Sequence, residues 1–180
     1  RSGRTQQTVP WSRIDRMVLN FTEGVYADAS DLVLTGQTRG GVGMTGLAGV
    51  GSTRLTWSVG SYLLSDRYQM LLGSGVGGVQ DLAGNALDGD GAVGSFPSGN
   101  GLPGGDWQMP LNVLVADVNG DGVVNTQDKD QVSLRYGATL GQPSYRSVVD
   151  INGDGVINVL DKALVATKLG TVLPAPLPLG

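Results

Sequence analysis

The sequence predicts a mainly β protein in which an antiparallel β-sandwich is followed by a small α-helical domain. Three observations support this prediction. Of the 16 acidic residues, 15 are Asp, which favours turns and helix caps, and one is Glu, which favours helix surfaces. Short segments that alternate apolar and polar residues occupy the first part of the chain. A duplicated segment with helix-length stretches free of Gly and Pro follows them.

The composition excludes several kinds of chemistry. The chain has 180 residues with no His and no Cys, which removes disulfides, thiolate or imidazole metal sites and Ser-His-Asp catalysis. The formal net charge of −4 gives no support for nucleic-acid binding, and no run approaches the ~18 apolar residues of a membrane span. Asp66 and Asp106 are candidates for a glycosidase carboxylate pair, but no pattern singles them out. We therefore expect no enzyme, no nucleic-acid partner and no membrane insertion.

Five segments alternate with period two and predict strands. The clearest runs from Thr53 to Val59 and places Leu55 and Trp57 on the same face as Val59. The other four share this pattern, with apolar faces formed by Met17, Leu19 and Phe21, by Leu32 and Leu34, by Tyr68, Met70 and Leu72, and by Trp107, Met109, Leu111 and Val113. Gly-rich turns separate the segments. We expect about seven short strands in all, and this number predicts an antiparallel sandwich over residues 11–115.

Proline and glycine positions refine this prediction. Pro110 lies inside the last strand, and because proline donates no ladder hydrogen bond, we expect that strand at a sheet edge or with a bulge. Residues 89–105 are rich in Gly, Pro and Ser and predict a long loop. Residues 1–10 are assigned to an N-terminal arm, and the Pro-rich residues 171–180 to an extended tail.

A sequence repeat begins at Val115. Residues 115–137 align with residues 148–170 at an offset of 33, and 12 of the 23 aligned positions are identical. Each copy is an Asp/Asn/Gly loop followed by a stretch without Gly or Pro. This duplication predicts a domain at residues 116–170 that is built from two loop-plus-helix units.

The helix in each copy is predicted from apolar spacing. In the second copy, helical spacing is shown by Leu160, Leu164, Val165 and Leu169, with Gly170 suited to the C-cap. In the first copy, Val132, Leu134 and Tyr136 are less periodic, but Gly137 ends the stretch in the same way.

Both loops follow the spacing D-x-[DN]-x-[DN]-G, which aims side-chain oxygens at one point and uses Gly for the sharp turn. All the donors are oxygen, and Ca²⁺ takes about six to eight of them, whereas Mg²⁺ demands a tighter octahedron. We therefore predict two Ca²⁺ ions. The metal ligands at positions one, three, five, seven (through the backbone carbonyl), nine and twelve are Asp117, Asn119, Asp121, Val123, Asn125 and Asp128 in the first loop. In the second loop they are Asp150, Asn152, Asp154, Val156, Asn158 and Asp161.

Residues 116–170 resemble a type I dockerin, a duplicated loop-plus-helix module whose Ca²⁺ ligands match the positions named above. The resemblance implies docking to a cohesin on a scaffold protein, through a Ser/Thr pair at loop positions ten and eleven. In this chain those positions hold Thr126-Gln127 in the first loop and Val159-Leu160 in the second. The second pair is apolar and departs from the family's pattern.

Residues 11–115 are similar to bacterial immunoglobulin-like domains of cell-surface proteins, in the runs IDRMVLNFTEGV, LLSDRYQMLLG and DLAGNALDG. This resemblance implies a β-sandwich with a structural or adhesive role, and an extracellular or cell-surface bacterial location. Two roles stay open. One is a non-catalytic subunit that self-associates into a surface assembly or fibre, or the C-terminal part of a large surface protein. The other is a docking module that attaches a larger secreted protein to a cohesin-like scaffold.

Two further patterns are weaker. The run Gly41–Gly46 satisfies G-x-G-x-x-G, but no βαβ unit surrounds it, so we expect a flexible loop and no dinucleotide site. An acidic cluster in a Gly-rich turn could hold a third Ca²⁺, although hydrogen-bonded turn residues are the favoured interpretation. The cluster comprises Asp81, Asn85, Asp88 and Asp90.

The three tryptophans raise the question of a sugar-binding platform. Trp57 and Trp107 are in phase with the apolar faces of their strands, which predicts core packing. Trp11 lies outside any alternating segment, so it is the one tryptophan for which a role as a sugar contact stays open.

Overall fold

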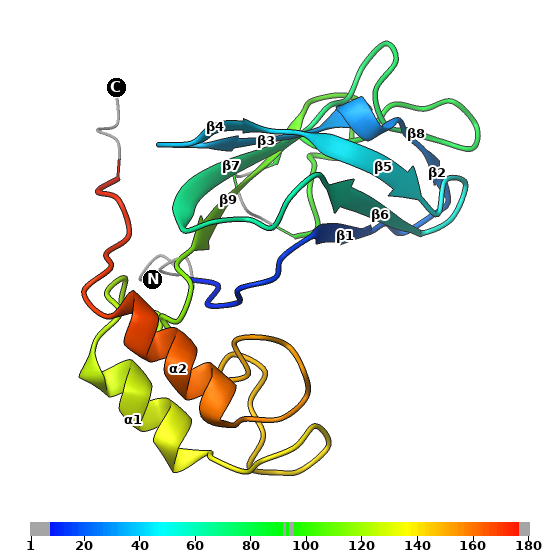
Figure 1. The fold of residues 1–180 in the computed structure, drawn as a ribbon. Coiled ribbons are helices and arrows are strands. Elements are labelled where there is room, and N and C mark those ends of the chain that lie inside the picture. Colours follow the sequence, from blue (N-terminus) through cyan, green and yellow to red (C-terminus); the bar gives the residue numbers. More distant parts are fainter. Residues whose placement is uncertain (1–7, 92, 94–95, 177–180) are drawn as a thin grey trace. The chain divides into compact units, whose positions relative to one another are not determined.

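The computed structural model describes residues 8–91, 93 and 96–176 (Figure 1). Within these residues the protein is mostly β, with three antiparallel sheets and two α-helices near the C-terminus, as the sequence predicts. The chain divides into two compact units. The repeat unit contains the residues up to Ile14, Tyr62–Arg67 and those from Leu111 onwards, and the β unit contains Asp15–Ser61 and Tyr68–Pro110. Most of the predicted N-terminal arm and the end of the predicted tail lie outside the described residues.

The strands form two larger sheets and one small one. The three-stranded sheet has the order β1-β6-β5, with β1 at Arg16–Asn20, β6 at Arg54–Val59 and β5 at Met44–Ala48. The four-stranded sheet has the order β4-β3-β7-β9, with β4 at Gly40–Val42, β3 at Leu32–Gly36, β7 at Asp66–Leu72 and β9 at Trp107–Val113. The small sheet pairs β2 (Val25–Tyr26) with β8 (Gln80–Asp81), and a short 3-10 helix, η1 (Ala29–Asp31), precedes β3.

The predicted apolar faces explain the register of the strands. In β6, Leu55, Trp57 and Val59 are buried, and their polar neighbours are not. Antiparallel pairing sets Met17 and Leu19 of β1 opposite Trp57 and Leu55, so the apolar sides of both strands coincide. The alternation predicted for β7 is likewise confirmed, since Tyr68, Met70 and Leu72 are all buried. Trp57 and Trp107 belong to the core, as predicted.

Two strand predictions have different outcomes. The expectation that Pro110 lies in an edge strand is confirmed, because β9 ends the order of the four-stranded sheet. The expectation of a flexible loop at residues 41–46 is wrong, because β4 and β5 occupy most of that run. Pairing of Val42 with Leu34 and of Leu47 with Trp57 gives these glycine-rich strands a template that their own composition does not suggest. The strand β5 rather than a helix follows the first glycines of this run, so this described segment is not the glycine-rich turn that opens a helix in a dinucleotide site.

The two helices of the repeat unit pack side by side (Figure 1). They are α1, at Thr126–Leu134, and α2, at Val159–Lys168. Val132 of α1 and its counterpart Val165 of α2 are fully buried. The apolar positions predicted around them are largely exposed: Leu134 and Tyr136 in the first copy, and Leu160 and Leu169 in the second. Helices this short bury only a narrow face, and each one also buries an acidic side chain there.

Each copy of the repeat completes the other. The residues after α1 pair with the second loop, where Ile157 N–H donates to the Ala138 carbonyl at 2.9 Å. The residues after α2 pair with the first loop in the same way, where Val124 N–H donates to the Thr171 carbonyl at 2.9 Å. Residues 171–173 are therefore the counterpart of residues 138–140, and this part of the predicted tail is a structural element of the repeat unit.

Candidate functional site

Each loop of the repeat unit is organised around the carboxylate at position one. Asp117 Oδ1 accepts hydrogen bonds from the backbone N–H groups of Gly120 and Asp121, at 2.8 and 3.1 Å, and its Oδ2 accepts one from Gly122 at 2.9 Å. The same three bonds surround Asp150 of the second loop, at 2.9, 3.2 and 2.8 Å. Gly122 has φ of 87°, which is the left-handed turn that the loop spacing requires of a glycine.

The carboxylate at position twelve closes the loop from the first turn of the helix. Asp128 Oδ1 accepts from Val118 N–H at 2.9 Å, and its Oδ2 accepts from Asn125 N–H at 2.8 Å. Asn125 is the N-cap of α1 and accepts in turn from Gln127 N–H at 2.7 Å. This reciprocal capping box places the short Asp side chain beside the loop backbone. In the second copy, Asp161 and the N-cap Asn158 form the same box.

The polar groups at positions three, five, seven and nine lie on the rim of each loop and contact one another. In the second loop, Asn152 Nδ2 donates to Asp154 Oδ2 at 2.8 Å, and Asn158 Nδ2 donates to the Val156 carbonyl at 3.2 Å. In the first loop, the matching contacts are 2.9 and 3.4 Å. The pKa of Asp154 is lowered, chiefly by the hydrogen bond from Asn152 and then by that from Val156 N–H.

The four inner carboxylates are buried and have no ion-pair partner among the described basic side chains. Asp117, Asp128, Asp150 and Asp161 have exposed fractions of 0–2%, and none of them forms an ion pair with a described Lys or Arg. Burial raises the pKa of Asp117; hydrogen bonds from Gly122 and Gly120 lower it in part, and the charges of Asp128 and Asp121 raise it. Buried carboxylates are normally paired or bound to a metal. The loops therefore carry negative charge that a cation would stabilise.

The donor set fits a hard, oxygen-loving cation. Every predicted ligand is a carboxylate, an amide or a backbone carbonyl, which suits Ca²⁺ and not a metal that prefers sulfur or nitrogen. Among the described residues, no three or more acidic side chains form a metal-binding group by themselves. A metal in either loop would therefore depend on the Asn side chains and the carbonyl at position seven as well as on the Asp residues.

One contact of the second loop was not predicted. Tyr145 Oη donates to Asp150 Oδ2 at 2.7 Å, and this hydrogen bond is the main reason that the pKa of Tyr145 is raised to about 12. At the offset of 33, the first copy has Asn112, whose Oδ1 accepts from Arg67 Nη1 at 3.2 Å. Tyr145 precedes the aligned repeat, so no sequence signal connects it to Asp150.

The acidic cluster of the β unit is engaged in its own turns. Asp81 Oδ1 accepts from Ala83 N–H and Asn85 N–H, each at 2.8 Å, and the side-chain bond from Asn85 is the main cause of its lowered pKa. Asp88 accepts from Asn100 N–H at 2.9 Å and from Gly101 N–H. These bonds agree with the turn interpretation and give no support to a third metal.

The remaining candidates have local structural partners. Trp11 Nε1–H donates to the Ser147 carbonyl at 2.7 Å, which ties this side chain to the repeat unit. Asp106 accepts from Ser74 N–H at 2.8 Å, and Asp66 accepts from Arg67 N–H at 2.9 Å. Nothing in these contacts identifies a catalytic pair.

The segment that contains the repeat matches a known protein family. Residues 115–170 match the family model described as the dockerin type I domain. No curated protein sequence matches the chain. In the described residues, no helix has both the length and the apolar character needed to cross a membrane.

Three solved structures show a distant likeness. The N-terminal part of the bacterial S-layer protein SbsC has 12% identity and a TM-score of 0.38, covering 59% of this chain and 23% of that one. Two interface mutants of a type II cohesin–X-dockerin complex from Acetivibrio cellulolyticus have 13% and 12% identity and TM-scores of 0.32, covering 88% of this chain and 97% of theirs. TM-scores this low do not establish a shared fold. On the family match, the chain carries a type I dockerin-like domain preceded by a β domain.

Proposed function

We propose that the repeat unit is a Ca²⁺-dependent docking module that binds a cohesin-like protein partner. One observation carries this proposal: four buried carboxylates lie at equivalent positions of two loops and form no ion pair with a described Lys or Arg. Type I dockerins bind calcium, and their function is docking rather than catalysis. The family match therefore supports both the metal and the role.

Each loop would hold one Ca²⁺ through six residues. The four buried carboxylates would form the inner part of the two sites, and the groups at positions three, five, seven and nine would complete them from the rim. The bound cation would supply the positive charge that the loops lack and would fix each loop on its helix. The proposed ligands are Asp117, Asn119, Asp121, Val123, Asn125, Asp128, Asp150, Asn152, Asp154, Val156, Asn158 and Asp161.

The exposed start of α2 supports a docking surface on the second copy. Val159 and Leu160 have exposed fractions of 60% and 55%. A cavity of about 400 Å³ adjoins Leu160 and is also lined by Leu164 of α2 and by Tyr62. Exposed apolar side chains beside a hollow are typical of a protein interface. The equivalent residues of α1, Thr126 and Gln127, offer polar groups, so we assign the main docking contact to the second copy.

A binding experiment tests this function. The full chain would be titrated against immobilised recombinant type I and type II cohesins, with Ca²⁺ and with excess EDTA. We expect binding only with Ca²⁺. The double variant Val159→Thr with Leu160→Gln, which gives the second copy a polar pair like that of the first, should weaken binding by at least about tenfold.

The matched control exchanges the residues in the opposite direction. Thr126→Val with Gln127→Leu should leave the affinity for the cohesin within about twofold of the parent. If no cohesin binds at saturating Ca²⁺, or if EDTA leaves binding unchanged, the proposed function is wrong.

The proposed location rests on the family match rather than on the fold. Dockerin modules occur in secreted and cell-surface proteins, so we propose an extracellular location, where Ca²⁺ is abundant enough for sites of modest affinity. Self-association into a fibre and the absence of catalytic activity both stay predictions.

A further inference from the structure

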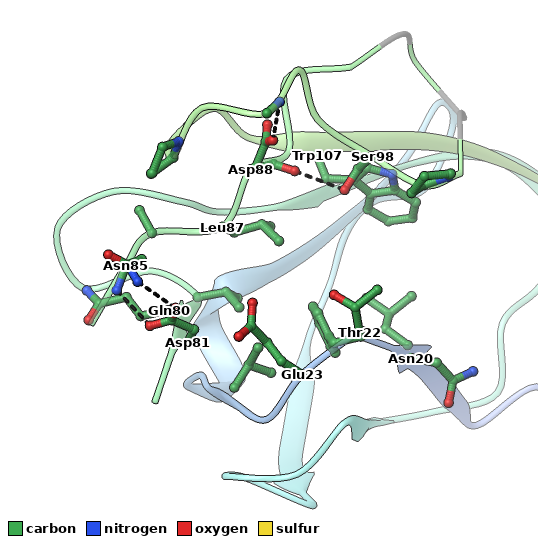
Figure 2. Close-up of a pocket in the computed structure, with 18 of the residues that line it drawn as sticks. Asn20, Thr22, Glu23, Gln80, Asp81, Asn85, Leu87, Asp88, Ser98 and Trp107 are labelled. Atoms are coloured by element: carbon green, nitrogen blue, oxygen red, sulfur yellow. Dashed lines mark hydrogen bonds between the residues drawn. The ribbon is translucent and has the colours of Figure 1, made fainter. Parts of the chain in front are cut away.

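The β unit contains a cavity that docking does not use (Figure 2). Its volume is about 580 Å³, which lies in the range of small-molecule sites. The chain segment after β1 forms one wall, and loop residues on either side of Asp88 form another. Figure 2 shows Thr22 and Glu23 on one side of the cavity and Trp107 and Ser98 across from them.

An aromatic pair forms part of this cavity. The ring centroids of Phe96 and Trp107 are 5.4 Å apart, with their planes tilted by 52°. Trp107 is buried, whereas Phe96 has an exposed fraction of 69%, as does Leu102, which also lines the cavity. Phe96 and Leu102 therefore give the cavity an apolar surface that is open to solvent, whereas Trp107 is buried beside Phe96.

The buried indole lacks a hydrogen-bond acceptor. Trp107 Nε1–H is buried and has no partner among the described residues. Buried donors of this kind are rare, because the group loses its bond to water and gains nothing in return. An occupant that offers an oxygen acceptor would remove this deficit.

Other polar groups of the cavity are free to bind. The side chains of Asn20, Thr22, Glu23 and Gln80 line the cavity and make no hydrogen bond with any described residue. Asp81 and Asp88 differ, because their carboxylate oxygens already accept bonds within their own loops. Glu23 is therefore the carboxylate of the cavity that is available to a ligand.

The chemistry of these groups selects the occupant. No lining residue is basic, which disfavours an anionic ligand. A simple cation would suit Glu23, but it has no acceptor for Trp107 Nε1–H. A pyranose has hydroxyl groups that both donate and accept, and an apolar C–H face that stacks on aromatic rings. We propose that this cavity binds a neutral saccharide, with the exposed Phe96 ring against the sugar face, Trp107 Nε1–H donating to a sugar oxygen and Glu23 accepting from the sugar hydroxyl groups.

The test uses the full chain with Ca²⁺ and soluble neutral oligosaccharides as probes: cellohexaose, xylohexaose, mannohexaose and chitohexaose. Binding would be followed by tryptophan fluorescence and by calorimetry. We expect at least one of them to bind with Kd below about 1 mM. Phe96→Ala should weaken binding by at least about tenfold, because it removes the exposed ring, and Glu23→Gln should weaken it by about threefold or more.

Two matched controls lie outside the cavity. Tyr26→Ala removes an exposed aromatic ring of the β unit, and Asp15→Asn removes an exposed carboxylate; each should leave binding unchanged. Trp107→Phe tests the indole N–H, and near-ultraviolet circular dichroism would show whether that variant keeps its fold. Because Phe96 is exposed, its truncation gives a clear result even if the Trp107 variant does not fold.

Three outcomes would overturn the proposal. In one, none of the oligosaccharides binds at about 10 mM. In another, binding persists unchanged in folded Phe96→Ala and Glu23→Gln variants. In the third, spermidine binds in place of the sugars and Glu23→Gln abolishes that binding, which would identify a cation site. Since the readout is sugar binding by the β unit, failure here leaves the docking function of the repeat unit intact.

Discussion

The two copies of the repeat are alike where they are buried and different where they are exposed. Their position-one carboxylates accept the same three backbone bonds, with lengths that agree within 0.1 Å. Val132 and Val165 are buried at the same position of the two helices. At the exposed start of the helices, in contrast, Thr126 and Gln127 are replaced by Val159 and Leu160. The loops and the core have the same chemistry in both copies, and the exposed start of the helix does not.

A second difference concerns how each loop is supported. Among the described residues, side chains outside the repeat donate hydrogen bonds to the second loop and not to the first: Tyr145 Oη donates to Asp150, and Ser12 Oγ donates to the Ile151 carbonyl. Both loops, however, are paired with the segment that follows the helix of the other copy. We therefore expect the two sites to differ in strength and yet to depend on each other.

Calcium removal should have the largest effect. With excess EDTA, both helices should lose their circular dichroism at 222 nm, because a repeat unit with four uncompensated buried carboxylates gains its stability from the bound metal. The β unit should keep its near-ultraviolet signal from Trp57. Adding Ca²⁺ back should restore the helices. An unchanged helical signal in excess EDTA would show that the repeat unit folds without metal.

Loss of one position-one carboxylate should affect both loops. Asp150→Ala should cost about 3 kcal/mol of Ca²⁺-dependent stability and should also weaken Ca²⁺ binding in the first loop, because that loop is paired with residues 171–173. Urea unfolding and calorimetry would measure the two effects. Asp130→Ala, which removes an exposed carboxylate of α1, is the control. If the first loop kept its full affinity in Asp150→Ala, the copies would be independent.

Removal of the Tyr145 hydroxyl should weaken the second loop more than the first. Tyr145→Phe deletes a charge-assisted hydrogen bond and should lower the free energy of unfolding by about 1.5 kcal/mol, with a larger loss of Ca²⁺ affinity in the second loop than in the first. Tyr136→Phe, at an exposed tyrosine, should have no effect. Equal weakening of both loops in Tyr145→Phe would contradict the predicted difference between them.

Exposed apolar residues of the helices should matter least for stability. Leu134→Ala should change the free energy of unfolding by less than about 0.5 kcal/mol, because its side chain is exposed. Val132→Ala, two residues earlier and fully buried, should cost about 1–2 kcal/mol. Thermal unfolding with saturating Ca²⁺ would compare them. A larger cost for Leu134 than for Val132 would mean that α1 buries a different face.

Features that are set by contacts between residues close together in the sequence could be predicted. The metal-loop positions could be predicted because the hydrogen bonds that the Asp and Asn side chains make within each loop run between residues at most ten positions apart, so fixed spacing determines them. The faces of β6 and β7 could be predicted because strand alternation alone decides which side chains are buried.

Features that depend on distant partners could not be predicted. Strands β4 and β5 form in a glycine-rich run because β3 and β6 pair with them. The helical spacing that includes Leu160 correctly predicted α2, but it could not show that Leu160, in the first turn, is exposed. Residues 171–173 looked like a tail because proline follows them, although Leu173 aligns with Leu140 at the same offset of 33.

The central claim is that each copy of the repeat holds one Ca²⁺. Native mass spectrometry of the full chain, exchanged into a volatile buffer with micromolar Ca²⁺, counts the bound ions directly. We predict a dominant species with two Ca²⁺ ions that is lost on chelation and that loses ions in the Asp117→Ala and Asp150→Ala variants, but not in Asp130→Ala. A metal-free chain, or one whose bound ions are unaffected by these two substitutions, would contradict the account.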